Sequence, residues 1–282
     1  MPNLFSNQSG AFISDGPLIF FPSSPLSNWG VMIGLFSSRV AIIFSCENFE
    51  KKNTTKITEV SLNKDQKQID TDEINHLLGK FDYKKDSSFI FVESKHASKS
   101  MYLHRETYSK FIEMYDAAKK EGVSLTIISG TRNFYEQKDI WNRKWENNIV
   151  SMDSIAAAKK ILLYSSMPST SRHHWGTDID LIKVYNSYFD AGSGLKAYKW
   201  LNENASKYGF CQVYDDKKIT KRTGYELEKW HWSYMPLSSK YLKRYNELIN
   251  YSMINGFKGS DLAKKIDPIK LYVNGINKTC QL

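Results

Sequence analysis

The sequence predicts an α+β domain in which helices flank a small, mainly antiparallel sheet. Segments with helical periodicity are interleaved with short apolar segments that suit strands, but the strands are short and the helix order is irregular. A doubly wound fold would need a regular succession of strands and helices, so the irregular order favours the α+β class. With 41% hydrophobic and 24% charged residues, the composition supports one folded body, which we expect over 71–282.

The clearest single element is an amphipathic helix over 106–121. Tyr108, Phe111 and Tyr115 recur at three- and four-residue steps, and Gly122 follows where a C-terminal cap belongs. The last 25 residues contain an Asn-Gly turn and are expected to pack against the body. Further helices are predicted over 134–146, 153–165, 195–208 and 239–252, and strands over 123–128, 176–183, 210–214 and 229–234.

The N-terminal part of the chain differs in composition from the rest. The apolar run 31–45 is too short for a membrane span, which needs about 20 apolar residues. It ends at Cys46 and resembles the apolar core and lipobox of a bacterial lipoprotein signal. We therefore expect an N-terminal extension over 1–46, export to the cell envelope or periplasm, and membrane attachment through lipidated Cys46. The alternative is that the apolar run 31–45 is not an export signal but a disordered segment or one that packs in the core. The polar, lysine-rich residues 47–70 predict a linker.

The formal net charge is +9, with lysines scattered singly along the chain. No arginine-rich run or nucleic-acid-binding signature occurs, so we expect no nucleic-acid partner. A solvated surface or attraction to an anionic matrix explains the charge. The cysteines Cys46, Cys211 and Cys280 form no metal-binding Cys-x-x-Cys pair. If Cys46 is lipidated, Cys211 and Cys280 can pair; two free buried thiols are the alternative.

Three of the six histidines fall in two short aromatic-rich segments. The first segment contains His173 and Asp180, and the second contains His231. Two imidazoles and one carboxylate suit zinc with a fourth position open for water, which is the form of a catalytic site. Gly176 lets the chain turn between His173 and the strand of Asp180, and a second strand can bring His231 beside it.

Two further side chains complete a hydrolytic arrangement. Glu228 precedes His231 by three residues and can face the metal from the turn before the strand. Zinc lowers the pKa of bound water to about 7, and a neighbouring carboxylate can take its proton and pass it to a departing amine. Arg132 follows the strand predicted over 123–128 and is a candidate donor to the developing oxyanion. Peptide hydrolysis is the chemistry that this set predicts.

These motifs resemble the M15 family of zinc metallopeptidases, which includes the VanY-type D-alanyl-D-alanine carboxypeptidases. The family pattern Ser-x-His-x-x-Gly-x-Ala-x-Asp falls on 171–180, and Glu-x-Trp-His falls on 228–231. Ser-Gly-x-Arg followed by Gln falls on 129–137. The resemblance covers about residues 75–280 and implies a single zinc-peptidase domain with a Hedgehog/DD-peptidase-like fold.

The resemblance also implies the roles of individual residues. His173, Asp180 and His231 would bind Zn²⁺, and Glu228 would be the general base. Arg132 would polarise the scissile carbonyl or hold it in place.

Three more positions follow from the same resemblance. Ser171 and Gln137 would bind the terminal carboxylate of the substrate. Asp178 stands where the family pattern has alanine. Because Asp178 and Asp180 face the same way in a strand, Asp178 either competes as a ligand or tunes its neighbours.

The implied function is that of a zinc-dependent D-alanyl-D-alanine carboxypeptidase, trimming peptidoglycan stem peptides by attack of metal-activated water. An L,D-carboxypeptidase or a peptidoglycan endopeptidase is the alternative within the same fold. A non-catalytic zinc-containing binding domain, as in Hedgehog signalling proteins, is the third hypothesis; it would not need Glu228 and Arg132 beside three ligands. We expect an exported monomer whose basic surface suits an anionic cell wall.

Overall fold

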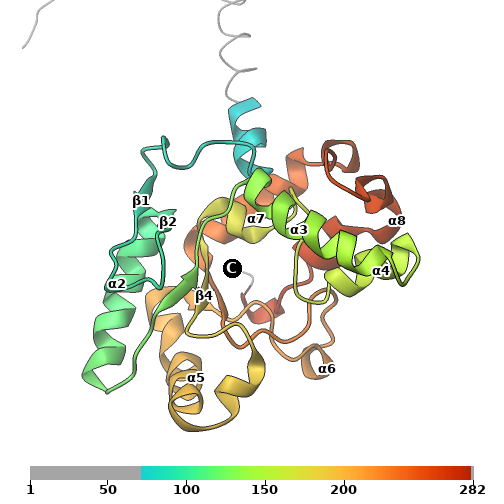
Figure 1. Ribbon diagram of the computed structural model, residues 1–282. Coiled ribbons are helices and arrows are strands. Elements are labelled where there is room, and N and C mark those ends of the chain that lie inside the picture. The colour runs from blue at the N-terminus through green and yellow to red at the C-terminus, as the bar shows by residue number, and fades with distance from the viewer. Residues whose placement is uncertain (1–70, 281–282) are drawn as a thin grey trace, which may run out of the picture. The chain divides into compact units, whose positions relative to one another are not determined.

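The computed structural model describes residues 71–280, so the extension expected over 1–46 and the linker over 47–70 lie outside the described residues. The described part has a two-stranded and a four-stranded antiparallel sheet among helices (Figure 1), which confirms the α+β prediction. The two-stranded sheet pairs β1 (Phe89–Phe91) with β2 (Tyr102–His104). The four-stranded sheet has the order β3-β4-β6-β5, with β3 at Ile127–Ser129, β4 at Asp178–Leu181, β5 at Phe210–Cys211 and β6 at His231–Tyr234.

Helices account for much of the remaining described chain. The longer ones are α2 (Arg105–Lys120), α3 (Phe134–Ile149), α5 (Gly192–Asn204) and α7 (Met235–Leu248). The shorter ones are α4 (Ser154–Ile161), α6 (Lys217–Thr220) and α8 (Ala263–Ile266), and residues 71–77 are also helical. Short 3₁₀ segments occur at Arg172–Trp175, Asn186–Asp190, Ala205–Tyr208, Tyr251–Met253, Ser260–Leu262 and Lys278–Cys280, and a π segment at Ile269–Val273. Within residues 71–280, no helix combines the length and apolar character needed to cross a bilayer.

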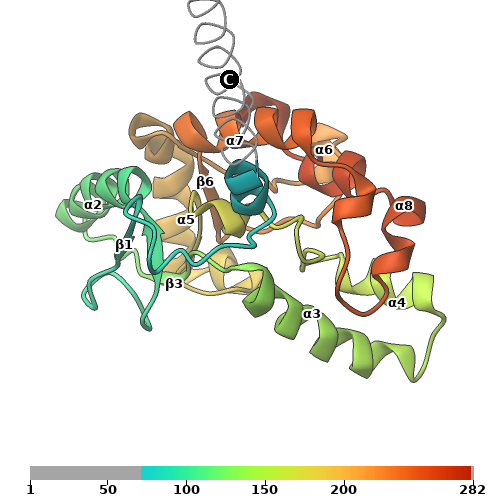
Figure 2. The ribbon, with the colours of Figure 1, turned by 90° about the horizontal axis from the view of Figure 1, so that it is seen from above.

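Two separate apolar cores support the sheet. One forms between the sheet, α2 and α5, and it contains Ile179 and Trp232. The other involves α3, α4, α7 and the C-terminal segments, and it contains Trp141 and Tyr245. Both ribbon views show α2 and α5 on one side and α3, α4 and α8 on the other (Figures 1 and 2).

Helix ends are set by local sequence signals. Gly122 follows α2 with a φ of 67°, and its N–H donates to Lys119 O at 3.0 Å, as the predicted C-terminal cap requires. A capping box begins α3, since the Asn133 side chain accepts from Glu136 N–H while the Glu136 carboxylate accepts from Asn133 N–H. This box starts the helix directly after Arg132 and so fixes the backbone that carries this side chain.

Some predicted boundaries were wrong. The strand expected over 123–128 forms only at Ile127–Ser129, because its partner β4 ends at Leu181 and offers no further ladder positions. The helix expected over 153–165 ends at Ile161, after which the chain turns toward the cleft described below.

Two other helices differ at one end. The helix expected over 195–208 is α5 followed by the 3₁₀ turn Ala205–Tyr208, and the cap predicted at Gly209 is present with a φ of 81°. The helix expected over 239–252 begins earlier, at Met235. Pro236 lies in its first turn, where the missing N–H of proline costs no helical hydrogen bond.

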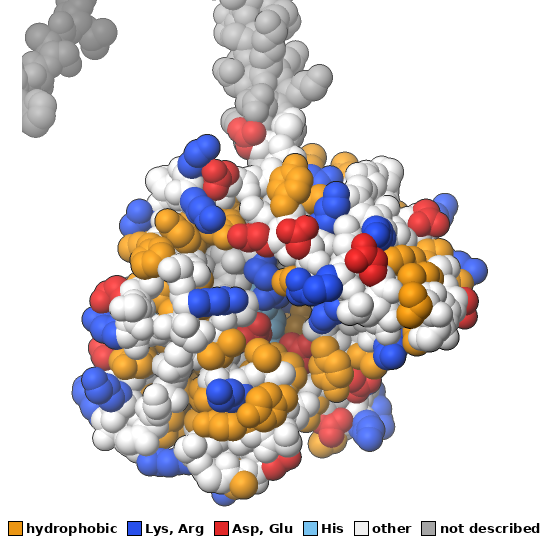
Figure 3. All heavy atoms as spheres, viewed as in Figure 1, with side chains coloured by type: hydrophobic (Ala, Val, Ile, Leu, Met, Phe, Trp, Pro, Cys, Tyr) orange, Lys and Arg blue, Asp and Glu red, His pale blue; other side chains and the backbone are white. Residues whose placement is uncertain are grey.

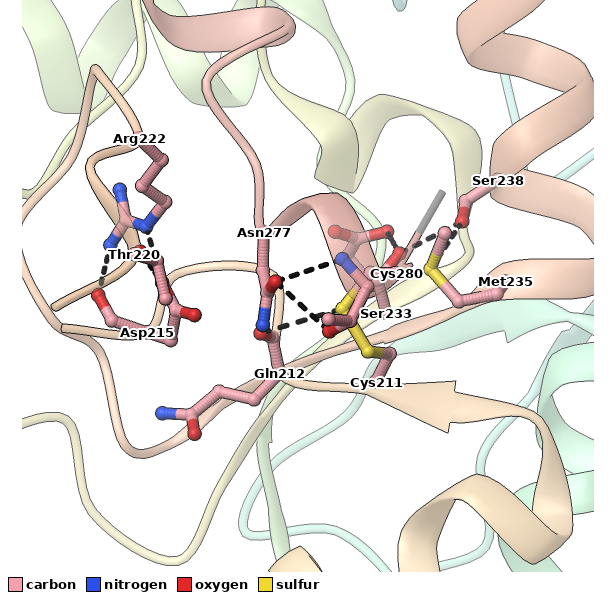
Figure 4. Close-up of a disulfide and its surroundings, with 12 residues drawn as sticks. Cys211, Gln212, Asp215, Thr220, Arg222, Ser233, Met235, Ser238, Asn277 and Cys280 are labelled. Atoms are coloured by element: carbon pink, nitrogen blue, oxygen red, sulfur yellow. Dashed lines mark hydrogen bonds and ion pairs between the residues drawn. A yellow bond between two sulfur atoms is a disulfide. The ribbon is translucent and has the colours of Figure 1, made fainter. Parts of the chain in front are cut away.

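The C-terminal segment packs on the body, as expected. Cys280 is disulfide-bonded to Cys211 in β5 (Figure 4), so the paired interpretation of these two cysteines is the correct one. Val273 and Ile276, which precede Cys280, are also buried. Cys46 lies outside the described residues.

Candidate metal centre and cleft

The pairing of β4 with β6 brings two of the chemical motifs together. Asp180 lies opposite His231, and Asp178 lies opposite Ser233. Opposed residues in an antiparallel pair project from the same face of the sheet. Ile179, between the two aspartates, faces the apolar core instead. The sheet register thus gathers acids and an imidazole on one face.

His173 comes from the 3₁₀ turn Arg172–Trp175, directly before β4. The turn ends at Gly176, whose φ is 69°. A Cβ at this position would lie 2.4 Å from Phe89 Cε1 and 2.9 Å from the backbone nitrogen of His104. Only glycine fits such a left-handed, crowded position. The turn predicted at Gly176 is therefore confirmed.

His173, Asp180 and His231 converge closely enough to hold one metal ion. Their ligand atoms all lie within 4.8 Å of one another, and within residues 71–280 no other group of three His, Cys, Asp or Glu meets this criterion. His173 Nε2 lies 3.5 Å from Asp180 Oδ2, and His231 Nδ1 lies 3.1 Å from Asp180 Oδ1. All three residues are buried.

The outer nitrogen of each imidazole has an acceptor as its partner. His173 Nδ1 is 2.9 Å from the carbonyl oxygen of Gly130, and His231 Nε2 is 2.9 Å from Asp178 Oδ2. Each outer nitrogen can therefore donate its hydrogen outward, which leaves the inner nitrogen available to give a lone pair to a metal ion once any proton on it has been displaced. Metal-bound histidines have this arrangement, so the donor set fits zinc.

The charges of the site depend on one another. Burial disfavours the ionised form of Asp180, but His173 and His231 outweigh it and hold the Asp180 pKa well below its usual range. Burial likewise lowers the pKa of His231, but Asp178 and Asp180 outweigh it and raise that pKa to about 9. Because a metal ligand must be deprotonated, metal binding at this site has to displace the proton on His231 Nδ1.

Glu228 lies in the turn that leads into β6. Its N–H donates to Tyr214 O at 2.9 Å, and its carbonyl accepts from His231 N–H at 3.2 Å. Glu228 Oε2 is 3.6 Å from His231 Nδ1. Burial raises the Glu228 pKa to about 8, although His231 opposes this rise. A cation beside the carboxyl would lower that pKa and leave the ionised form that a general base needs.

Arg132 reaches the same place from the loop before α3. Its Nη1 lies 3.9 Å from Asp180 Oδ2 and donates to the hydroxyl of Ser129. Its Nε donates to Gln137 Oε1 at 3.1 Å, and Gln137 Nε2 donates to the carbonyl of Ser166 at 2.8 Å. Gln137 therefore holds Arg132 in position against the loop that follows α4.

His174 also positions the Arg132 loop. Its Nδ1 is 2.7 Å from Arg132 O, and its Nε2 accepts from Ser169 N–H at 3.1 Å. Burial lowers the His174 pKa to about 3, so the ring is a neutral link between two loops. It takes no part in the metal cluster.

The three candidate metal ligands, Glu228 and Arg132 lie in a cleft of about 580 Å³. The space-filling view shows a hollow near the centre of this face, with histidine visible inside it (Figure 3). Arg132, Gln137, His173, Asp180, Glu228 and His231 all line the cleft. Among the residues that complete the wall are Lys144, Tyr164, Tyr185, Tyr214 and Trp230.

Comparisons with known proteins place the site within a recognised sequence family match. Residues 100–237 match the family model described as VanY: D-alanyl-D-alanine carboxypeptidase. This part of the chain is therefore similar to the VanY family of carboxypeptidases.

Curated relatives cover the same region. A putative carboxypeptidase YodJ of Bacillus subtilis is 34% identical over 154 residues, which are 53% of this chain and 51% of the relative. A D-alanyl-D-alanine carboxypeptidase of Enterococcus faecium is 31% identical over 178 residues, or 62% of this chain and 50% of the relative. The chain thus spans about half the length of the curated relatives it matches.

Solved structures give more distant likenesses. VanYB in complex with D-Alanine-D-Alanine aligns with a TM-score of 0.43 and 20% identity, over 68% of this chain and 88% of that one. The LdcB LD-carboxypeptidase aligns with a TM-score of 0.42 and 23% identity, over 69% of this chain and 78% of that one.

The VanY-type region brings most of the predicted site residues together. The exception is Ser171, which is buried outside the cleft lining, with a hydroxyl that has no hydrogen-bond partner among residues 71–280. Asp178 lies beside His231 on the side of the ring away from Asp180, so it does not join the ligand cluster.

Sequence reasoning missed part of the cleft wall. Lys144 lies seven residues after Gln137 on α3, so helical periodicity alone would have indicated that they share a face. Tyr214 packs its ring against His231, with centroids 4.5 Å apart, and no motif indicated this. Trp230 precedes β6 and also lines the cleft.

Proposed function

We propose that this protein is a zinc-dependent D-alanyl-D-alanine carboxypeptidase that trims peptidoglycan stem peptides. The observation that carries the proposal is the convergence of His173, Asp180 and His231 within 4.8 Å, with Glu228 3.6 Å from His231 in the same cleft. The match of residues 100–237 to the VanY family model supports the reaction class, and the names of the enterococcal relatives support the substrate.

In this proposal His173, Asp180 and His231 hold the zinc ion. When bound, zinc supplies a Lewis acid that polarises a carbonyl oxygen and activates water. Glu228 accepts the proton of the attacking water and passes it to the departing amine. Its burial beside His231 keeps this proton transfer away from bulk solvent.

Arg132 acts on the scissile carbonyl. Its Nε and Nη1 are engaged with Gln137 and Ser129, so the guanidinium is held rigidly and can direct Nη2 at a developing oxyanion. Gln137 uses one amide hydrogen on Ser166 and retains a second for the terminal carboxylate of the substrate. Ser171 is kept as the proposed second contact for that carboxylate because its hydroxyl has no partner among residues 71–280, although the residue is buried and does not line the cleft.

The test is digestion of defined muropeptides by the purified protein, followed by mass spectrometry. A pentapeptide ending in D-Ala-D-Ala should lose one alanine, while a tetrapeptide and a cross-linked dimer should stay intact. Cleavage of the tetrapeptide alone would identify an L,D-carboxypeptidase, and cleavage of the dimer an endopeptidase. No cleavage of any of the three by zinc-loaded protein would contradict the proposal.

Metal-site variants provide the matched control for this assay. His173→Ala should lose zinc, and Glu228→Ala should keep it while losing activity. Zinc content measured by atomic emission separates the two variants. A zinc content unchanged in His173→Ala would contradict the ligand assignment.

We further propose that the protein is exported, acts as a monomer through a peptidase domain over 71–282, and is anchored by lipidated Cys46. The Cys211–Cys280 disulfide supports an oxidising compartment, and the net charge of +9 suits an anionic wall. Labelling of cells with a fatty-acid analogue should mark the wild type and not Cys46→Ser. Equal labelling of both would contradict the anchor.

A further inference from the structure

The carboxylate of Asp178 is fully buried and uses both of its oxygens. Its Oδ1 accepts from the hydroxyls of Thr177 and Ser233, each at 2.8 Å. Its Oδ2 accepts from Arg172 Nε at 3.0 Å and lies 2.9 Å from His231 Nε2. Such a carboxylate needs a compensating charge, because an isolated ion in the interior is very costly.

Arg172 supplies that charge from within the interior. It is 1% exposed, its Nη2 donates to Ser233 Oγ at 2.7 Å, and its guanidinium lies 5.0 Å from the ring centre of Trp175. Arg172 and Asp178 therefore form a buried ion pair between the turn that carries His173 and strand β4.

The geometry separates Asp178 from the ligand cluster. Asp178 contacts the Nε2 side of the His231 ring, while Asp180 and Glu228 approach Nδ1. A metal that binds Nδ1 lies across the imidazole from Asp178. The carboxylate therefore acts on the metal position only through His231, and not as a competing ligand.

We infer that Asp178, compensated by Arg172, is the positioning residue that orients His231 for metal binding. Its oxygen holds the Nε2 hydrogen of His231, so Nδ1 presents its lone pair at the position where His173 and Asp180 converge. Carboxylates in this relation fix the tautomer and orientation of a histidine ligand and increase its basicity. The inference rests on the proposed zinc function.

The test compares two double variants of the full-length protein. Both Arg172→Met/Asp178→Asn and Arg172→Met/Asp178→Leu remove the buried ion pair, and Asn and Leu are close in size. Only Asn offers an oxygen to His231 Nε2. We measure zinc affinity by competition with a chromophoric chelator and the midpoint of thermal unfolding for the metal-free proteins.

We expect the Leu double variant to bind zinc about 10- to 100-fold more weakly than wild type, the usual effect of losing such a partner. The Asn double variant should stay within a few-fold of wild type. Both should unfold at similar temperatures, since both lose the same ion pair. Equal zinc affinity in the two variants would overturn the inference, because a purely structural ion pair predicts that result.

Two controls separate failure of this inference from failure of the zinc function. His231→Ala should lose zinc binding; if it binds as wild type does, the zinc site itself is wrong. If His231→Ala loses zinc while the two double variants bind equally, only the role of Asp178 is wrong. If a double variant does not fold, single Asp178→Asn and Asp178→Leu variants give the same comparison.

Discussion

The two faces of strand β4 are both buried but differ in what keeps them stable. Ile179 and Leu181 are fully buried in the apolar core with α2 and α5. Asp178 and Asp180 are also buried, on the face that meets His231. The apolar face depends on filled volume, whereas the acidic face depends on a few specific partners. Substitutions on one face should therefore change stability, and substitutions on the other should change metal binding and catalysis.

The largest effect should come from the acidic side, at Glu228. Glu228→Ala removes the proposed general base, and we expect kcat to fall by about 10²- to 10⁴-fold. Zinc content and fold should be retained, because Glu228 is not a ligand in this proposal. Kinetics on a D-Ala-D-Ala pentapeptide check this; full activity in the variant would break the proposed division between the faces.

The apolar face should respond through stability. Ile179→Ala should lower the free energy of unfolding by about 2–5 kcal/mol, because it leaves a cavity in a closed core. The matched control is Ile219→Ala, because Ile219 is 77% exposed. This substitution should change the free energy of unfolding by about 0.5 kcal/mol or less. Urea unfolding measures both. Loss of zinc from natively folded Ile179→Ala would show that the two faces are not independent.

Glu228 should also affect stability when zinc is removed. Its pKa is raised to about 8, mainly by burial, so the folded state favours the protonated form. This penalty is absent below the unfolded pKa and grows as pH rises toward the folded value. Glu228→Gln should therefore stabilise the zinc-free protein at pH 8 by up to about 4–5 kcal/mol, because the pKa rises from 4.5 to about 8 on folding and each pKa unit corresponds to 1.36 kcal/mol. A similar gain at pH 4 would contradict a carboxylate origin.

The smallest effect is expected at Lys144. This half-buried cation lines the cleft, burial lowers its pKa, and none of residues 71–280 forms an ion pair with it. It is suited to a carboxylate of the bound peptide, so Lys144→Met should raise KM by about 1.5- to 5-fold, as for a partly exposed charge pair. Arg143→Met, an exposed neighbour on α3, should leave KM unchanged. An equal rise in KM for the two variants would indicate that Lys144 contributes only a general electrostatic attraction for the substrate.

Sequence reasoning succeeded where a pattern has one physical meaning. The periodicity of 106–121 and the glycines at the caps gave α2, and the spacing from His173 to Asp180 gave the turn at Gly176. Strand limits were less accurate because they depend on how far a partner extends, as at Ile127–Ser129. The role of Asp178 could not be read from its own segment, since its partner His231 is 53 residues away.

The residues of the cleft wall also could not be predicted from their own segments. Tyr214 meets His231 only because β5 and β6 pair and the chain then folds back across the site. The hydrophobic periodicity of a single segment does not predict a contact of this kind between distant segments. The sequence indicated chemical identity, and the three-dimensional register was needed to show which groups meet.

The disulfide between Cys211 and Cys280 has a consequence for how the protein is made. The bond spans 69 residues and joins an edge strand of the site sheet to the final 3₁₀ turn (Figure 4). Cys211 must remain a thiol until Cys280 has been synthesised and has arrived beside it. Oxidation is therefore a late step of maturation. Protein produced in a reducing cytoplasm should carry two free thiols in this region, detectable by alkylation and mass spectrometry.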